Sequence, residues 1–216
     1  MRTPLALAGQ RVGIMGGTFN PPHAGHMMVA RTALQRLGLD QLWWVVTPGN
    51  PLKINGGLPP LAARVAQVQE LARDPRMRVT GFEHELGSTF TVDSLAFLRR
   101  RHPGVHFVWV MGADGLASFH RWRDWRRIAQ LMPMAVVDRP GYRLRALASP
   151  AARALVRVRQ RESGALGLSL RAPPAWCLLT TRLSALSSTD LRAKSMPKAK
   201  LLATRDGADH GRLPRP

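Results

Sequence analysis

The stretch Gly16-Gly17-Thr18-Phe19-Asn20-Pro21-Pro22-His23-Ala24-Gly25-His26 connects an apolar run, Val12–Met15, to a segment with apolar residues at helical spacing, Met27–Leu37. This pattern predicts a buried strand, a glycine-containing turn and a helix. Glycines let a ligand approach the main chain closely, and a helix N-terminus attracts anions. His23 and His26 would lie on one face of the first helical turn. The stretch therefore predicts a phosphate site with titratable donors, and the alternative is a pair of capping or core histidines.

These eleven residues resemble the HxGH signature of the nucleotidyltransferase superfamily and, in the fuller form GGTFNPPHAGH, the bacterial nicotinate mononucleotide adenylyltransferases (nicotinate-nucleotide adenylyltransferases). The resemblance implies adenylyl transfer from ATP to nicotinate mononucleotide, which gives deamido-NAD (nicotinate adenine dinucleotide) and pyrophosphate in NAD biosynthesis. It implies that His23 and His26 are catalytic. It further implies that four residues of the turn bind ATP, namely Gly16, Gly17, Thr18 and Phe19. Asn20 stands where many members of the family have aspartate.

Strand-like and helix-like segments alternate along the chain, which predicts an α/β fold: a Rossmann-like parallel sheet with helices on both faces, of the HxGH nucleotidyltransferase type. The expected strands are Val12–Met15, Leu42–Thr47, Arg78–Phe82, Val105–Met111, Ala135–Val137 and Trp176–Thr181. The expected helices are Gly25–Leu37, Leu61–Arg73, Thr91–Arg101, Trp125–Leu131 and one that begins at Ser188. The mixed composition of Arg139–Ser169 predicts a mobile loop with a weak helix at Ala151–Gln160.

A second signature, Ser187-Ser188-Thr189-Asp190-Leu191-Arg192, resembles the ISSTxIR motif of the same family. The resemblance implies that Ser187, Ser188 and Thr189 bind ATP and that Arg192 is catalytic. The alternative for the hydroxyls is plain helix capping. The family also has a catalytic lysine in a proline-rich loop that Lys53 matches, although Lys53 could be an exposed loop residue. Arg64 begins the next helix at a position where the family often has arginine.

Two further blocks resemble the acceptor and nucleotide sites of the family. In Gly87–Leu95, which resembles SYTxDTL, Thr91 matches the threonine that binds nicotinate mononucleotide, and Phe90 replaces the usual tyrosine. In Met111–Trp122, which resembles GADxLxxFxxW, the resemblance implies that Gly112 and Asp114 bind ATP and that Trp122 stacks on the nicotinate ring. The alternatives are an N-cap for Thr91 and a core tryptophan for Trp122.

The chain of 216 residues has a formal charge of +19, and residues 139–216 carry 16 Lys and Arg against 4 Asp and Glu. Such a field attracts polyanions, so a basic nucleic-acid-binding protein on a retained nucleotide fold is an alternative from another class. The basic stretches lack interleaved aromatic residues, which weighs against it. We expect a nucleotidyltransferase domain over residues 1–192 and a basic, disordered tail over residues 193–216.

Several classes of protein are excluded or disfavoured. The sequence has no GxxxxGK[ST] P-loop, no GxGxxG fingerprint and no zinc-ligand spacing. No window of 18 apolar residues predicts a transmembrane helix, and the short apolar run at the N-terminus does not predict a secretory signal. The lone Cys177 predicts a core thiol in a reducing cytoplasm.

No protein metal site is expected, because no other acid has ligand spacing near Asp114, so the ATP phosphates would carry Mg²⁺. Nicotinamide mononucleotide remains an alternative acceptor for the same reaction. A second copy of the chain, in a homo-oligomer, is a possible partner. No membrane partner is expected, and a nucleic-acid partner is disfavoured.

Overall fold

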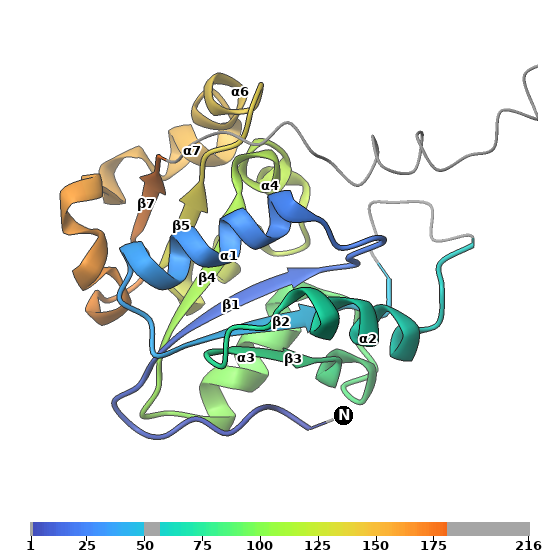
Figure 1. Cartoon of the computed structure of the whole chain (residues 1–216). Coiled ribbons are helices and arrows are strands. Elements are labelled where there is room, and N and C mark those ends of the chain that lie inside the picture. Colours follow the sequence, from blue (N-terminus) through green and yellow to red (C-terminus); the bar gives the residue numbers. More distant parts are fainter. Residues whose placement is uncertain (1, 50–56, 181–216) are drawn as a thin grey trace, which may run out of the picture.

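A parallel sheet of seven strands, in the order β3-β2-β1-β4-β5-β7-β6, forms the centre of the protein (Figure 1). The structure is a computed structural model that describes residues 2–49 and 57–180. Every strand pairs with its neighbours in parallel. The strands are β1 (Arg11–Gly17), β2 (Gln41–Val46), β3 (Met77–Thr80), β4 (His106–Gly112), β5 (Met134–Val137), β6 (Arg159–Gln160) and β7 (Trp176–Leu179). The sequence prediction of a Rossmann-like parallel α/β fold is confirmed.

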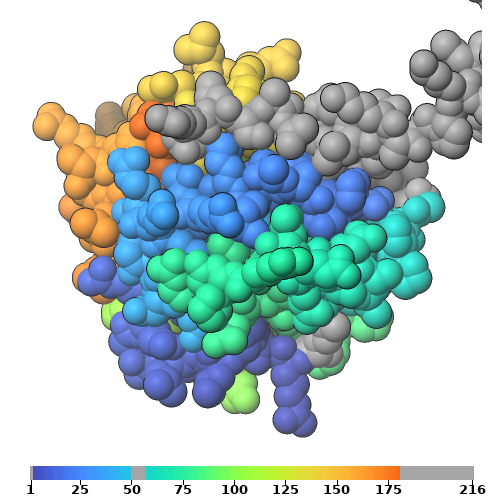
Figure 2. All heavy atoms as spheres, viewed as in Figure 1, coloured from blue at the N-terminus to red at the C-terminus, as the bar shows by residue number. Residues whose placement is uncertain are grey.

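Helices cover both faces of the sheet, which explains why the central strands are apolar at nearly every position. On one face the core includes buried side chains of α1 (Ala24–Arg36), α2 (Leu61–Leu71) and the 3₁₀ segment η4 (Glu162–Leu170). The opposite core contains side chains of α3 (Thr91–Arg101), α4 (Ala113–Ser118), α5 (Trp125–Leu131), α6 (Arg143–Leu147) and α7 (Pro150–Ala154). Figure 2 shows the surface that α1 and α2 form side by side on the first face.

The order of the strands places a crevice at the centre of the sheet. The chain runs from β1 outward through β2 to β3, and then returns to β4 on the other side of β1. This reversal between β1 and β4 is a topological switch point, where open parallel sheets bind ligands beyond the carboxyl ends of the strands. The turn after β1 and the loop after β4 therefore lie where a ligand is expected.

One sequence prediction about the fold is wrong. The segment Arg139–Ser169 is not a loop with one weak helix, because it contains α6, α7, the short 3₁₀ helix η3 (Val156–Val158), β6 and most of η4. The predicted helix at Ala151–Gln160 ends at Ala154. These elements are too short to show a helical period. They are fixed instead by single buried residues such as Ala146 and Leu168, both 0% exposed.

The third strand is also displaced from its predicted position. It covers Met77–Thr80, and Phe82 belongs to the 3₁₀ helix η1 (Phe82–His84). The predicted helix at Ser188 and the tail lie outside the described residues. No helix among residues 2–49 and 57–180 is long and apolar enough to span a membrane.

Candidate active site

The turn after β1 has little room for side chains other than those present. A Cβ on Gly16 would lie 2.7 Å from the indole of Trp109, and one on Gly17 would lie 3.1 Å from the ring of Phe19. Phe19 itself has a φ of 45°, in the left-handed region, and is 3% exposed. Its ring packs against Trp44 and His26, with centroid distances of 5.1 and 5.0 Å. Phe19 therefore anchors the turn, and the two glycines leave its main chain accessible.

His23 and His26 form the start of α1. His23 is the N-cap, and its Nδ1 accepts a hydrogen bond of 3.0 Å from the N–H of Gly25. The Nδ1 of His26 accepts a bond of 3.3 Å from the N–H of His23, and the two rings stack at 3.8 Å between centroids. The capping alternative is thus correct for the Nδ1 atoms. It also fixes the tautomer, since a neutral imidazole that accepts at Nδ1 carries its proton at Nε2.

Arg64 ties together the loops that surround the turn. Its guanidinium donates hydrogen bonds to the carbonyls of Thr18, Thr47, Pro48 and Pro59, at 2.9, 2.7, 3.2 and 3.0 Å. The side chain is 1% exposed, and burial lowers the pKa of its guanidinium. Among the described residues it has no carboxylate partner. Arg64 is therefore a buried structural cation that fixes the position of the loop after β1 relative to the loop after β2.

A pocket opens beside the turn at the carboxyl ends of β1, β2 and β4. Four predicted site residues line it: Gly16, Gly17, Thr91 and Trp122. The other lining residues are Thr47, Gly49, Glu83, Thr89, Phe90, Trp109, Arg123 and Ile128. The pocket thus unites the turn after β1, the loop after β2, the start of α3 and the segment before α5.

Trp122 is positioned by other aromatic rings. It makes edge contacts with Phe119 and Trp109, at centroid distances of 5.5 and 6.2 Å. The ring is only partly buried and faces the pocket, so it offers a flat surface to an aromatic ligand. Thr91 is the first residue of α3, and the N-cap is Phe90, so the N-cap alternative for Thr91 is wrong.

Glu83 is a buried acid in the wall of this pocket that the sequence analysis did not identify. It is 6% exposed, and Ser94 Oγ donates a hydrogen bond of 2.6 Å to its Oε1. Burial raises the pKa of the Glu83 carboxyl, and the bond from Ser94 partly opposes this effect. The segment Phe82-Glu83-His84-Glu85-Leu86 contains two acids, and the sequence alone does not show that Glu83 is buried and Glu85 exposed.

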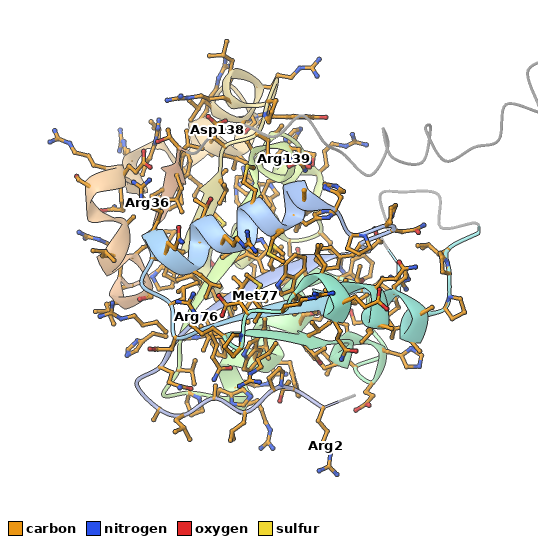
Figure 3. The ribbon with its side chains drawn as sticks, in the orientation of Figure 1. Arg2, Arg36, Arg76, Met77, Asp138 and Arg139 are labelled. Atoms are coloured by element: carbon orange, nitrogen blue, oxygen red, sulfur yellow. The ribbon has the colours of Figure 1, made fainter. Side chains whose placement is uncertain are left out.

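Gly112 lies at the end of β4, and Asp114 lies in the first turn of α4. Asp114 Oδ2 accepts a bond of 3.0 Å from Arg139 Nη1, and the Arg139 side chain is 12% exposed. A Cβ on Gly112 would meet both of these side chains. Figure 3 shows Arg139 beyond the end of β5. The pair therefore forms a second polar region, beyond the ends of β4 and β5, and neither of its residues lines the pocket.

Several predicted site residues lie outside the described residues, namely Lys53, Ser187, Ser188, Thr189 and Arg192. Within residues 2–49 and 57–180, no group of three His, Cys, Asp or Glu is arranged to hold a metal ion.

Cys177 is 0% exposed on β7, and burial raises the pKa of its thiol to about 12, so the prediction of a core thiol is confirmed.

Comparisons with known proteins identify the family of the chain. The chain matches the cytidylyltransferase-like family over residues 14–194. It is 56% identical to a probable nicotinate-nucleotide adenylyltransferase of Methylorubrum extorquens (strain PA1) over 184 residues, which cover 85% of this chain and 100% of that protein. It is 55% identical to a protein of the same name from Rhizobium meliloti (strain 1021) over 182 residues, 84% of this chain and 97% of that one.

Solved structures show the same fold. A Plasmodium falciparum nicotinic acid mononucleotide adenylyltransferase complexed with APC superposes with a TM-score of 0.62 at 17% identity, and the match covers 89% of this chain and 88% of that one. The complex of that enzyme with NaAD gives a TM-score of 0.59 at 17% identity, over 85% and 83% of the chains. The chain belongs to the cytidylyltransferase-like family and, within it, to the nicotinate-nucleotide adenylyltransferases.

Proposed function

We propose that this protein transfers the adenylyl group of ATP to nicotinate mononucleotide, which gives nicotinate adenine dinucleotide and pyrophosphate in NAD biosynthesis. The observation that carries the proposal is the position of the His23–His26 turn. It lies at the switch point between β1 and β4, beside the aromatic pocket that Gly16 and Gly17 help to line, and the Asp114–Arg139 pair lies beyond the ends of β4 and β5. A reaction that joins two mononucleotides through their phosphates needs two such halves with an anion-binding turn between them.

The pocket is the acceptor half. Trp122 offers its face to the pyridine ring, and Thr91 begins α3, so it lies at the positive end of the dipole of that helix. Gly16 and Gly17 form the floor where the pocket meets the turn. The mononucleotide phosphate would therefore extend from the pocket toward His23 and His26.

The region beyond β4 and β5 is the ATP half. Arg139 holds the Asp114 carboxylate in place, and its remaining lone pairs suit ribose hydroxyls. Gly112 makes room for these two side chains, which a Cβ at its position would meet. The triphosphate would lie along Gly16–Phe19, where the anchored turn brings the main chain close to the phosphates.

The chemistry is an in-line displacement. A phosphate oxygen of the mononucleotide forms a bond to the α-phosphorus of ATP, and the bond from that phosphorus to the bridging oxygen breaks, so that pyrophosphate leaves. Nε2–H donors on His23 and His26 stabilise the charge that develops on the phosphoryl oxygens. By resemblance, Lys53 and Arg192 add positive charge, and Ser187, Ser188 and Thr189 bind the triphosphate.

Mg²⁺ would be bound chiefly by the ATP phosphates and water, where it neutralises phosphate charge. We also propose that residues 1–192 form the catalytic domain, that residues 193–216 form a basic tail, and that the protein acts in the cytoplasm.

The test is a parallel assay of the purified protein with ATP, Mg²⁺ and either nicotinate mononucleotide or nicotinamide mononucleotide, with pyrophosphate and dinucleotide measured. We expect product mainly from the nicotinate compound. Product mainly from the amide would retain the reaction and overturn the assigned acceptor. No product from either, together with a salt-sensitive shift of nucleic acid in a gel, would favour the nucleic-acid-binding alternative.

A further inference from the structure

Arg123 is the only cationic side chain among the described residues that line the acceptor pocket. We infer that Arg123 is a specificity-determining residue, whose guanidinium favours an acceptor with a ring carboxylate over the corresponding amide. The inference rests on the proposed function and identifies the side chain that makes the acid the preferred acceptor.

An aromatic ring holds the guanidinium near the acceptor. The Cζ atom of Arg123 lies 4.5 Å from the centroid of the Phe90 ring. Phe90 is the N-cap of α3, directly before Thr91, and Arg123 directly follows Trp122. A cation–π contact of this kind restrains a long side chain that would otherwise sample many rotamers. The charge is therefore held over Phe90, which lines the pocket together with Thr91 and Trp122.

The other partner of Arg123 is weak. Its Nε lies 3.7 Å from Asp124 Oδ2, and the two side chains are 58% and 62% exposed. Solvent screens such a pair, so it competes little with a ligand. Among the described residues, the terminal nitrogens of Arg123 make no hydrogen bond. They are the paired donors that fit a carboxylate in bidentate geometry.

Glu83 is the only acid among the described residues that line the pocket. A carboxylate there would repel an acidic acceptor, but burial disfavours its charged form. The electrostatic field of the described pocket is therefore dominated by the cation of Arg123. An amide acceptor, which carries no charge on its ring substituent, gains less from this field than an acid does.

The test is a competition assay. Nicotinate and nicotinamide mononucleotides are mixed with ATP in one reaction, so the ratio of the two dinucleotides reports the ratio of kcat/KM whatever the order of binding. The Arg123→Gln variant is compared with wild type, and Arg123→Lys retains the charge without the planar fork. The matched control is Arg126→Gln, because the Arg126 Cζ lies 4.4 Å over the Trp125 ring but does not line the pocket.

We expect the acid-to-amide ratio to fall about tenfold in Arg123→Gln, since one exposed charge-assisted contact is lost. Arg123→Lys should fall between this variant and wild type, and Arg126→Gln should equal wild type. A ratio that stays within about twofold of wild type in Arg123→Gln would overturn the inference. An equal fall in Arg126→Gln would also overturn it, because the effect would then come from the general basic field.

Calorimetric binding of each mononucleotide separates this inference from the proposed function. If wild type makes no dinucleotide, the proposed function fails, and binding still decides the role of Arg123. Weaker binding of the nicotinate compound alone in Arg123→Gln supports the role, and unchanged binding rejects it.

Discussion

Replacing Arg64 should damage both stability and catalysis, although the residue lies outside the pocket. The Arg64→Met variant keeps the volume of the side chain and removes every donor. Four carbonyls lose their partner, those of Thr18, Thr47, Pro48 and Pro59. A hydrogen bond from a charged donor contributes about 1.5–3 kcal/mol to stability. The cost of removing the guanidinium from water offsets several kcal/mol of the stabilisation that the four bonds give together.

The net loss in the free energy of unfolding should therefore be about 3 kcal/mol, since loop carbonyls can recover part of the loss through water. For a domain of this size, that corresponds to a fall in Tm of roughly 6–12 °C. In Arg64→Lys the ammonium group has three donors on a single nitrogen, which cannot reach all four carbonyls as the planar guanidinium does. The loss in the free energy of unfolding should therefore be intermediate. The control is Arg76→Met, which removes two exposed hydrogen bonds, of 3.1 and 2.8 Å, to the Asp74 carboxylate and should change stability by less than about 1 kcal/mol.

Activity should fall more than the folded fraction does. Arg64 connects the loops after β1 and β2, which line the phosphate turn and the pocket, and a displacement of about 1 Å at such a site can cost roughly 100-fold in rate. The assay measures pyrophosphate release at a temperature where circular dichroism shows each variant fully folded. An Arg64→Met variant with a Tm within about 2 °C of wild type and an unchanged kcat/KM would refute this reasoning.

Three further predictions concern single residues of the site. His26→Ala should lose the capping bond, at about 1 kcal/mol, and most of its turnover; wild-type turnover would remove His26 from the phosphate site. Gly16→Ala should destabilise by about 1–3 kcal/mol in chemical denaturation, because its Cβ would lie 2.7 Å from Trp109, whereas Gly164→Ala, with no atom within 4 Å, should be nearly neutral. Glu83 has a folded-state pKa above its unfolded value, so its contribution to stability declines as pH rises between those two values. Glu83→Gln should therefore gain stability relative to wild type as pH rises above about 4, the ordinary pKa of a glutamate, and a difference that is flat with pH would contradict the burial of a carboxylic acid there.

Hydrophobic periodicity alone predicted the larger elements. Thr91–Arg101 and Trp125–Leu131 form helices with the predicted bounds, because each has apolar residues at helical spacing. The region between β5 and β7 did not follow from periodicity, since helices of five residues and an edge strand of two contain too few positions to show a period. Their positions depend on the contacts that they make with α4 and the sheet.

The site was predictable where one contiguous motif builds it. The stretch from Gly16 to His26 forms the turn and the capped helix start, and Thr91 and Trp122 meet in the pocket with the two glycines. Glu83 and Arg123 were missed because only the folded chain places them in one cavity. The bonds of Arg64 to Thr18 and Thr47 span 46 and 17 residues, and no local pattern encodes such distances.

The arginines of this chain show why net charge is a poor guide to function. A charge of +19 predicts attraction to polyanions in general. The structure places three arginines near the site in three different environments. Arg64 is 1% exposed, and its guanidinium donates hydrogen bonds to four carbonyls, so its charge stabilises the loops after β1 and β2. Arg139 is 12% exposed and orients Asp114. Arg123 is 58% exposed and restrained mainly by an aromatic ring, which leaves its donors to a ligand. Because the three differ in partners and burial rather than in type, loss of each should have a different main effect: on stability and the position of the loops for Arg64, on ATP binding for Arg139 and on the choice of acceptor for Arg123.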